Sequence, residues 1–216
     1  MPCTLLWDND GVLVLTEDRY FQACRETLAE LGVELTRSFF IDHSLLKGLS
    51  VFDLVADRGF GKEKLAELKR KRDRRFAELI DANPCTVDGA EDVLRSLYGR
   101  LRMGVVTGAL RRHFDRSHAR SGLLKYFDFV VAREDYERGK PHPDSYRTAL
   151  QRFGLNPDEC VVVEDTGRGL QAARAAGLRC LVIPHDLTRG QDFGGAHEVL
   201  RSIRDVPEAI RRLGLL

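Results

Sequence analysis

The sequence Thr4-Leu5-Leu6-Trp7-Asp8-Asn9-Asp10-Gly11 decides the fold prediction, because a short, mainly apolar run stops abruptly at two carboxylates. Such a run, without polar alternation, is typical of a strand that is buried on both faces of a sheet. Trp7 is therefore expected in the core rather than in a substrate site. Four similar runs follow, at residues 103–106, Phe129–Val131, 161–163 and 180–183.

Helical stretches separate the later strands, which predicts an α/β fold. The segment Asp144–Phe153 is one of them, because Pro143 suits the first helical turn and Gly154 suits the C-terminal cap. Strands that alternate with helices along the chain form parallel sheets covered by helices. We therefore predict one parallel sheet wrapped by helices.

The first two predicted strands are too far apart for a simple connection. Roughly ninety residues separate Asp10 from residue 103, whereas a crossover between parallel strands needs only about a dozen. Within this interval apolar residues recur at helical spacing, as at Phe21, Cys24 and Leu28. The interval is therefore predicted to contain an inserted helical domain.

The limits of the insertion follow from the chemistry of the chain at its ends. A residue before proline is pushed out of helical geometry, so Asn83-Pro84 is predicted as the return hinge. Residues 16–84 are assigned to the helical domain, and residues 1–15 and 85–216 to the sheet domain.

The composition is that of a globular protein without a broad charge bias. Of 216 residues, 43% are hydrophobic and 31% are charged, and the formal net charge is +1. No apolar run approaches the roughly 20 residues needed to cross a bilayer. We expect no nucleic-acid partner, no membrane partner and a cytoplasmic location, and the oligomeric state is left open. The five cysteines, without C-x-x-C pairing, are expected as reduced, mostly buried thiols.

One local exception to this balance is the basic run at residues 62–75, which carries eight positive and three negative side chains. We interpret it as a solvated helix face. RNA binding is the weaker hypothesis, because aromatic side chains beside the run are limited to Phe76. Attraction of anionic substrates to the run is a third hypothesis.

Two acidic pairs follow predicted strands directly. Asp8 and Asp10 come after the first strand, and Glu164 and Asp165 end the strand at residues 161–163. In parallel sheets ligands bind outside the carboxyl ends of the strands, so both pairs are expected at one edge. Carboxylates gathered there repel unless a cation lies among them, and Mg²⁺ prefers oxygen ligands. The alternative is that Asp8 and Asp10 only cap a turn.

Two further residues could bind a phosphate group at this edge. Thr107 follows the strand at residues 103–106 and precedes Gly108, so a hydroxyl and an unhindered backbone N–H lie together. Lys140 lies in a loop before a predicted helix, where its ammonium could neutralise phosphate and carboxylates. The alternatives are a helix N-cap for Thr107 and a solvated charge for Lys140.

These residues together resemble the four motifs of the haloacid dehalogenase-like superfamily. The position of the insertion resembles the helical-cap subgroup, which includes phosphoglycolate phosphatase-like enzymes and beta-phosphoglucomutase. The resemblance implies a Rossmann-like parallel sheet core with helices on both faces and an inserted α-helical cap domain. The matching residues are Asp8-Asn9-Asp10-Gly11-Val12-Leu13, Thr107-Gly108, Lys140-Pro141 and Glu164-Asp165-Thr166 with Gly169.

The resemblance also implies roles for individual residues. Asp8 would attack phosphorus, and Asp10 would protonate the leaving oxygen and then activate water. Thr107, Gly108 and Lys140 would hold the phosphoryl oxygens. The ligands of Mg²⁺ would be Asp8, the Asp10 carbonyl oxygen and Asp165, with Glu164 as a partner.

In the cap, residues 46–50 resemble the loop that reaches the substrate in this subgroup, so Lys47, Gly48 and Tyr20 are candidate substrate residues. Tyr20 stands where beta-phosphoglucomutase has a histidine, and Val51 stands where it has an arginine. These departures favour a phosphatase acting on a small phosphorylated metabolite over a sugar-phosphate mutase. Asp10 argues against dehalogenation, because a halide leaves without a proton.

A regulatory or binding protein that accepts phosphate without turnover is the alternative from another class. Receiver domains use a similar acidic cluster, but they are about one small domain in length and have no place for the insertion. His142 and His185 lie in predicted loops and are assigned no role, because Asp10 accounts for proton transfer.

Overall fold

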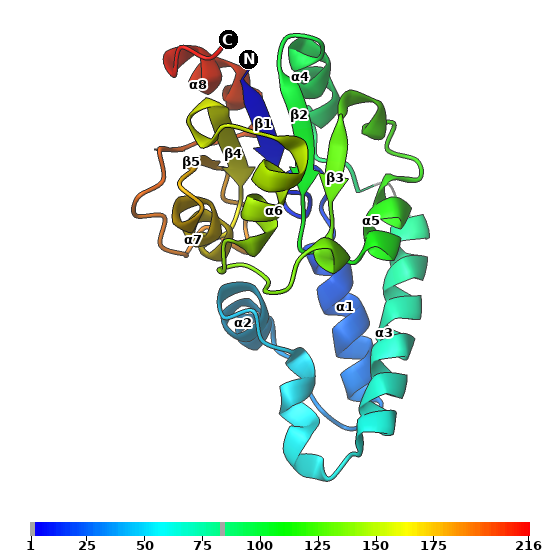
Figure 1. Cartoon of the computed structure of the whole chain (residues 1–216). Helices are drawn as coiled ribbons and strands as arrows, with labels where there is room; N and C mark the ends of the chain where they lie inside the picture. The colour runs from blue at the N-terminus through cyan, green and yellow to red at the C-terminus, as the bar shows by residue number, and fades with distance from the viewer. Residues whose placement is uncertain (1–2, 83–84) are drawn as a thin grey trace. The chain divides into compact units, whose positions relative to one another are not determined.

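The computed structural model describes residues 3–82 and 85–216, and the chain divides into two compact units (Figure 1). The core unit consists of Met1–Leu15 and Cys85–Leu216, and the inserted unit is Thr16–Pro84. The predicted return hinge at Asn83-Pro84 lies outside the described residues.

The core unit contains a six-stranded parallel sheet in the order β3-β2-β1-β4-β5-β6. Its strands are β1 Thr4–Trp7, β2 Arg102–Val106, β3 Phe129–Val131, β4 Cys160–Glu164, β5 Arg179–Val182 and β6 Glu198–Val199. The predicted parallel sheet is confirmed, and five of its strands match the predicted runs to within one residue at either end. The sixth strand, β6, was not predicted.

Alternation along the strands supplies both faces of this sheet with apolar side chains. On β1, Leu5 and Trp7 join one cluster with residues of α4, α5 and α8, whereas Leu6 joins another with residues of α6 and α7. Helices therefore cover both faces, as predicted. The helices are α4 Ala90–Leu97, α5 Arg111–His118, α6 Asp144–Phe153, α7 Gly167–Ala175 and α8 Val206–Arg212.

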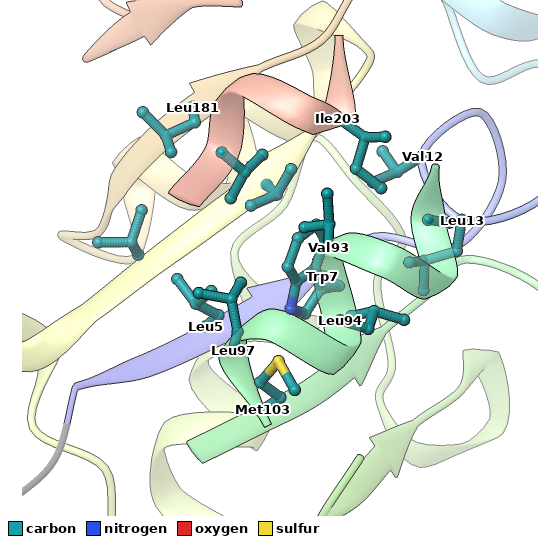
Figure 2. Packing of buried hydrophobic residues seen from close by; sticks show 14 of the residues in the cluster. Leu5, Trp7, Val12, Leu13, Val93, Leu94, Leu97, Met103, Leu181 and Ile203 are labelled. Carbon is teal, nitrogen blue, oxygen red and sulfur yellow. The ribbon is translucent and has the colours of Figure 1, made fainter. Parts of the chain in front are cut away.

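The first of these clusters surrounds Trp7, which is fully buried, so its predicted place in the core is confirmed. Figure 2 shows Trp7 with Val93 and Leu94 of α4 in this cluster. Burying a large apolar side chain contributes about 1.5–3 kcal/mol, so this packing anchors the strand that ends at Asp8.

Helix α6 spans Asp144–Phe153, as predicted. Pro143 precedes its first residue, and its fixed φ favours the start of a helix. Gly154 follows the last residue with φ of 61°, a left-handed conformation that glycine adopts at low cost.

The two chain segments that flank the inserted unit are hydrogen-bonded to each other within the core unit. The N–H of Leu15 donates to the carbonyl of Cys85 at 2.6 Å, and the N–H of Val87 donates to that of Leu13 at 2.9 Å. Val14 and Thr86 form an antiparallel bridge between these bonds. The chain therefore leaves the core and returns to it at one place.

The inserted unit is helical, and its two long helices pack together. Cys24 and Leu28 of α1 are buried in its core with Leu68 of α3, and Phe21 packs against them. The helical spacing read from the sequence is therefore confirmed for α1. The elements are α1 Glu17–Ala29, α2 Arg37–Phe39, the π-helix η1 Phe40–Leu46, the 3₁₀ helix η2 Val51–Arg58 and α3 Lys62–Ala82.

The basic run lies in the first two-thirds of α3, and part of it is paired with acids of α1. Arg75 contacts Glu26 at 2.6 Å, and Lys71 forms an ion pair with Glu30. Arg72 departs from the predicted solvated face, because its side chain is only 11% exposed and its guanidinium covers the Tyr20 ring. The run thus holds α1 and α3 together as well as facing solvent.

All five cysteines are buried free thiols, as predicted. Burial raises the pKa of the Cys3 and Cys160 thiols to about 11, so both are protonated at neutral pH. Across residues 3–82 and 85–216, no helix has both the length and the apolar character needed to span a bilayer.

Candidate active site

The carboxyl ends of β1 and β4 bring the two acidic pairs together. Trp7 pairs with Val163 in the register of these neighbouring strands, so Asp8 follows one strand where Glu164 ends the other. The N–H of Asp8 donates to the carbonyl of Val163 at 2.9 Å, which continues the ladder beyond β1. Asp8, Glu164 and Asp165 are all buried.

Lys140 lies between the two acidic pairs. Its Nζ is 2.6 Å from Oδ1 of Asp8 and 2.6 Å from Oε1 of Glu164, and it also donates to the carbonyl of Val106 at 3.1 Å. The side chain is 9% exposed, so the alternative of a solvated charge is wrong. The hydroxyl of Tyr146, on α6, donates to the same oxygen of Glu164 at 2.7 Å.

Burial and mutual charge set the protonation of this group. Burial raises the pKa of Asp8 well above its usual value, and Glu164, Asp165 and Asp10 add to this effect against the opposing charge of Lys140. Burial acts to raise the pKa of Glu164, but the ammonium of Lys140, with the hydrogen bonds from Tyr146 and the Asp165 N–H, outweighs burial and lowers that pKa. Lys140 itself stays protonated, because Asp8 and Glu164 outweigh its burial and raise its pKa.

The acidic residues fit a divalent cation. Oxygens of Asp8, Glu164 and Asp165 lie within 4.8 Å of one another. Oδ1 of Asp165 is buried and makes no hydrogen bond within residues 3–82 and 85–216. Burial raises the pKa of Asp165 to about 6, a cost that a nearby cation would offset. An all-oxygen set of this kind suits Mg²⁺.

Thr107 and Asp10 meet beside this cluster. The Oγ of Thr107 donates to Oδ2 of Asp10 at 3.4 Å and accepts from the N–H of Ala109 at 2.9 Å. Helix α5 begins four residues after Thr107 with Leu110 as its N-cap, so the N-cap alternative for Thr107 is wrong. The hydroxyl of Tyr136 donates to the carbonyl of Thr107 at 2.9 Å.

Two glycines of the predicted motifs differ in what their surroundings require. A Cβ on Gly11, whose φ is +82°, would lie 2.4 Å from Oδ2 of Asp165, so packing there demands glycine. A Cβ on Gly108 would meet nothing within 4 Å. Gly108 therefore leaves the backbone beside Thr107 open to solvent and to a ligand.

Three contacts of the site were not predicted from the sequence. His185 was assigned no role, yet its Nε2 lies 3.0 Å from Oδ2 of Asp165. Tyr146 and Tyr136 hold Glu164 and Thr107 by the hydroxyl bonds described above. The only signal for Tyr146 is its place in the first turns of α6, soon after Lys140. His185 and Tyr136 carry no local pattern that marks them.

The remaining predicted site residues belong to the inserted unit. Lys47 and Gly48 follow η1 and are exposed, and Gly48 has φ of 71°. Tyr20 lies on α1, where its ring meets that of Phe76 edge-on at 5.3 Å and lies 4.6 Å from the Arg72 guanidinium carbon.

Comparison with known proteins points to one family. The family model described as haloacid dehalogenase-like hydrolase matches residues 5–183. The chain is 32% identical to protein CbbY of Rhodobacter capsulatus over 203 residues, which covers 89% of each chain. It is 31% identical over 179 residues to the fructose-1-phosphate phosphatase YqaB of Escherichia coli, covering 81% of this chain and 92% of that protein.

Solved structures extend the likeness to the fold. The crystal structure of CbbY from Rhodobacter sphaeroides with phosphate gives a TM-score of 0.82 at 29% identity, covering 95% of this chain and 96% of that one. A mutant of the same protein in complex with xylulose-(1,5)bisphosphate gives 0.80 at 29% identity, with 94% and 95% covered.

Proposed function

The chain belongs to the haloacid dehalogenase-like hydrolase family, and we propose that it is a magnesium-dependent phosphatase that forms an aspartyl-phosphate on Asp8. The observation that carries this proposal is the position of Lys140, 2.6 Å from both Asp8 and Glu164. A buried ammonium held against a strand-end carboxylate can bind a phosphoryl group as that carboxylate attacks it. Asp10 and Thr107, side by side at the end of neighbouring strands, complete the set.

In the proposed first step an oxygen of Asp8 attacks phosphorus, and the bond from phosphorus to the leaving oxygen breaks. Asp10, in its acid form, gives its proton to that oxygen, so that the product leaves as an alcohol. In the second step Asp10 takes a proton from water as the water oxygen attacks phosphorus. The Asp8–phosphorus bond then breaks, which releases phosphate and restores the carboxylate.

The proposed ligands of Mg²⁺ are Asp8, Asp165 and the carbonyl oxygen of Asp10, with Glu164 as a partner. When bound, the ion supplies positive charge that offsets the repulsion between a carboxylate and a phosphate. Lys140 does the same from the protein side, and Thr107 and the Gly108 N–H are proposed to hold the phosphoryl oxygens. Gly108 suits this role, since it leaves the backbone open.

We propose residues 16–84 as the cap that selects the substrate, with Tyr20, Lys47 and Gly48 as the residues that contact it. Phosphorylated sugars are the class to test first. This choice is supported by the names of two relatives, the fructose-1-phosphate phosphatase above and a phosphorylated carbohydrates phosphatase of Thermotoga maritima, 29% identical over 195 residues.

The test is phosphate release from a panel of sugar phosphates and other small phosphomonoesters, with Mg²⁺ or with a chelator. Wild-type protein is compared with Asp8→Asn, Asp10→Asn and Asp158→Asn, where Asp158 is an exposed control. We expect magnesium-dependent release by the wild type and the control, and none by the other two. Mass spectrometry of wild-type protein quenched in acid during turnover should detect one added phosphoryl group on Asp8, and Asp8→Asn should not acquire it.

Two other outcomes would overturn the proposal. Interconversion of sugar phosphates with a bisphosphate primer, without net release, would make the protein a mutase. A stable phosphoprotein that releases no phosphate would favour a regulatory role.

A further inference from the structure

Asn9, between the two proposed catalytic aspartates, organises the backbone that carries them. Its carbonyl accepts hydrogen bonds from the N–H groups of Leu13 at 2.8 Å and Val14 at 3.1 Å. The loop after β1 therefore folds back around this residue. The side chain of Asn9 is fully buried, so its amide must find partners inside the protein.

His118 supplies the partner of that amide. This residue ends α5, far from Asn9 in the sequence, and its Nε2 lies 2.7 Å from Oδ1 of Asn9. Its Nδ1 lies 2.9 Å from the hydroxyl of Ser121. Burial lowers the pKa of His118 to about 4, so the imidazole is neutral at pH 7 and carries one N–H. Because Oδ1 can only accept, that proton belongs on Nε2.

The hydrogen bond is the main restraint on the Asn9 side chain. The amide nitrogen, Nδ2, is buried and has no partner in the part of the chain that the structure describes. Without His118 both ends of a buried amide would lack a partner, and the side chain would have to move. Any such movement shifts the loop that carries Asp8 and Asp10.

The bond also joins the two loops that the proposed reaction uses. Helix α5 follows the Thr107 loop, and the Oγ of Thr107 donates to Asp10 at 3.4 Å. The pair Asn9–His118 is a second, buried connection between the same two segments. Among the described residues the His118 ring is hydrogen-bonded to Asn9 and Ser121 and not to Asp8, Asp10 or Thr107, so its effect would pass through geometry alone.

We propose that His118, by donating from Nε2 to Asn9, is a positioning residue that fixes Asp10 against Thr107. This inference rests on the proposed function, because it assigns Asp10 a part in the reaction. Misplacing a reacting group by about 1 Å can cost on the order of a hundredfold in rate. Loss of the bond should therefore lower kcat and leave KM, to which Lys140 and the residues proposed in the cap also contribute, much less changed.

The kinetic test compares four variants on a substrate of the wild type. His118→Phe keeps the ring shape and removes the donor, and we expect kcat to fall by about tenfold to a hundredfold. His118→Gln restores a donor near the Nε2 position and should recover much of that loss. Asn9→Leu should lower kcat as His118→Phe does. The double variant Asn9→Leu/His118→Phe should have a kcat no lower than that of the more impaired single variant, because the two residues act as a unit.

A stability control separates positioning from general loss of structure. Val93→Ala removes buried methyl groups of α4 from the apolar cluster that contains Trp7, and it leaves the Asn9–His118 hydrogen bond in place. It should be destabilised and keep its kcat. If His118→Phe keeps kcat within twofold of Val93→Ala, the inference is overturned.

A spectroscopic readout is independent of activity. In ¹⁵N NMR the wild-type His118 ring should be protonated on Nε2 and not on Nδ1, with a slowly exchanging N–H whose signal shifts in Asn9→Leu. A ring protonated on Nδ1 would overturn the inference directly. Wild-type protein that shows the expected signal but hydrolyses no monoester would overturn the proposed function instead, and with it the catalytic meaning of the bond.

Discussion

A Cβ on Gly169 would lie 2.0 Å from the carboxyl carbon of Glu164, so the first turn of α7 can pack against this acid only if residue 169 is glycine. The substitution Gly169→Ala must push Glu164 away from Lys140 and Tyr146. We expect unfolding to become easier by about 1–3 kcal/mol, as for other overpacked cores. Phosphatase activity should fall more than tenfold. Urea unfolding and phosphate release measure the two effects.

Gly190→Ala is the matched control for this change, because a Cβ there meets nothing within 4 Å. It should leave both quantities unaltered. Full activity in Gly169→Ala would show that Glu164 can move without consequence and would contradict the role given to it.

The hydroxyl of Tyr146 is predicted to stabilise the ionised form of Glu164. Tyr146→Phe keeps the ring beside Lys140 and removes only the bond of 2.7 Å to Oε1. A hydrogen bond to a charged group contributes about 1.5–3 kcal/mol, and we expect a loss of that size in the free energy of unfolding. Tyr126→Phe, whose hydroxyl bonds to the half-exposed Glu91, should lose less. Equal losses in the two variants would contradict the prediction.

Magnesium is predicted to raise the stability of the protein by binding the native carboxylates. At a concentration of about 100 times Kd, a ligand of the folded state adds about 2.7 kcal/mol to the free energy of unfolding. Thermal unfolding with and without Mg²⁺ measures this shift, and a chelator should reverse it. Asp165→Asn removes one negative charge from the cluster and should abolish the stabilisation by Mg²⁺. The exposed Asp158→Asn should keep it. The same shift in both variants would place the ion elsewhere.

His118 is predicted to make folding sensitive to acid. Its pKa falls from 6.5 in an unfolded chain to about 4 in the folded protein, because burial disfavours the charged ring. Between these values the unfolded chain binds a proton that the folded protein does not, so stability is lost as pH falls. The loss between pH 7 and pH 5 should be about 2 kcal/mol.

Urea unfolding at the two pH values measures this effect. His118→Phe should lose about 2 kcal/mol less between pH 7 and pH 5 than the wild type does. The exposed His197→Gln should behave as the wild type. An unchanged pH dependence in His118→Phe would mean that the ring is charged in the folded protein.

The sequence predicts the sheet well because its strands are buried on both faces. Runs such as Thr4–Trp7 can be recognised from the local sequence, since a short, mainly apolar run is typical of a strand that is covered on both faces. Strand β6 was not predicted, because Glu198–Val199 is only two residues long, lies at the edge of the sheet and includes a charged residue. The π-helix Phe40–Leu46 was not predicted either, because its turns depart from the usual helical period.

Part of the candidate site could be predicted from the sequence and part could not. Asp8 and Glu164 could be placed together in advance, because they lie at the carboxyl ends of strands that share one edge. Lys140, in a loop before a helix, was placed with them by its charge and by the resemblance to the family motifs. The residues that hold them could not be placed in advance. His118 meets Asn9 only through the path of the whole α5 segment, and His185 reaches Asp165 from a loop whose course no local pattern defines.

The bridge between Val14 and Thr86 has a consequence for how such a protein can evolve. Because the two backbone segments are already joined there, a tight turn could close the gap in place of the intervening residues, and the sheet would keep its register. Duplication and recombination could therefore replace, lengthen or remove the insertion without disturbing the chemistry at the strand ends. New specificities could then arise by exchange of one segment, while the reaction itself is inherited unchanged.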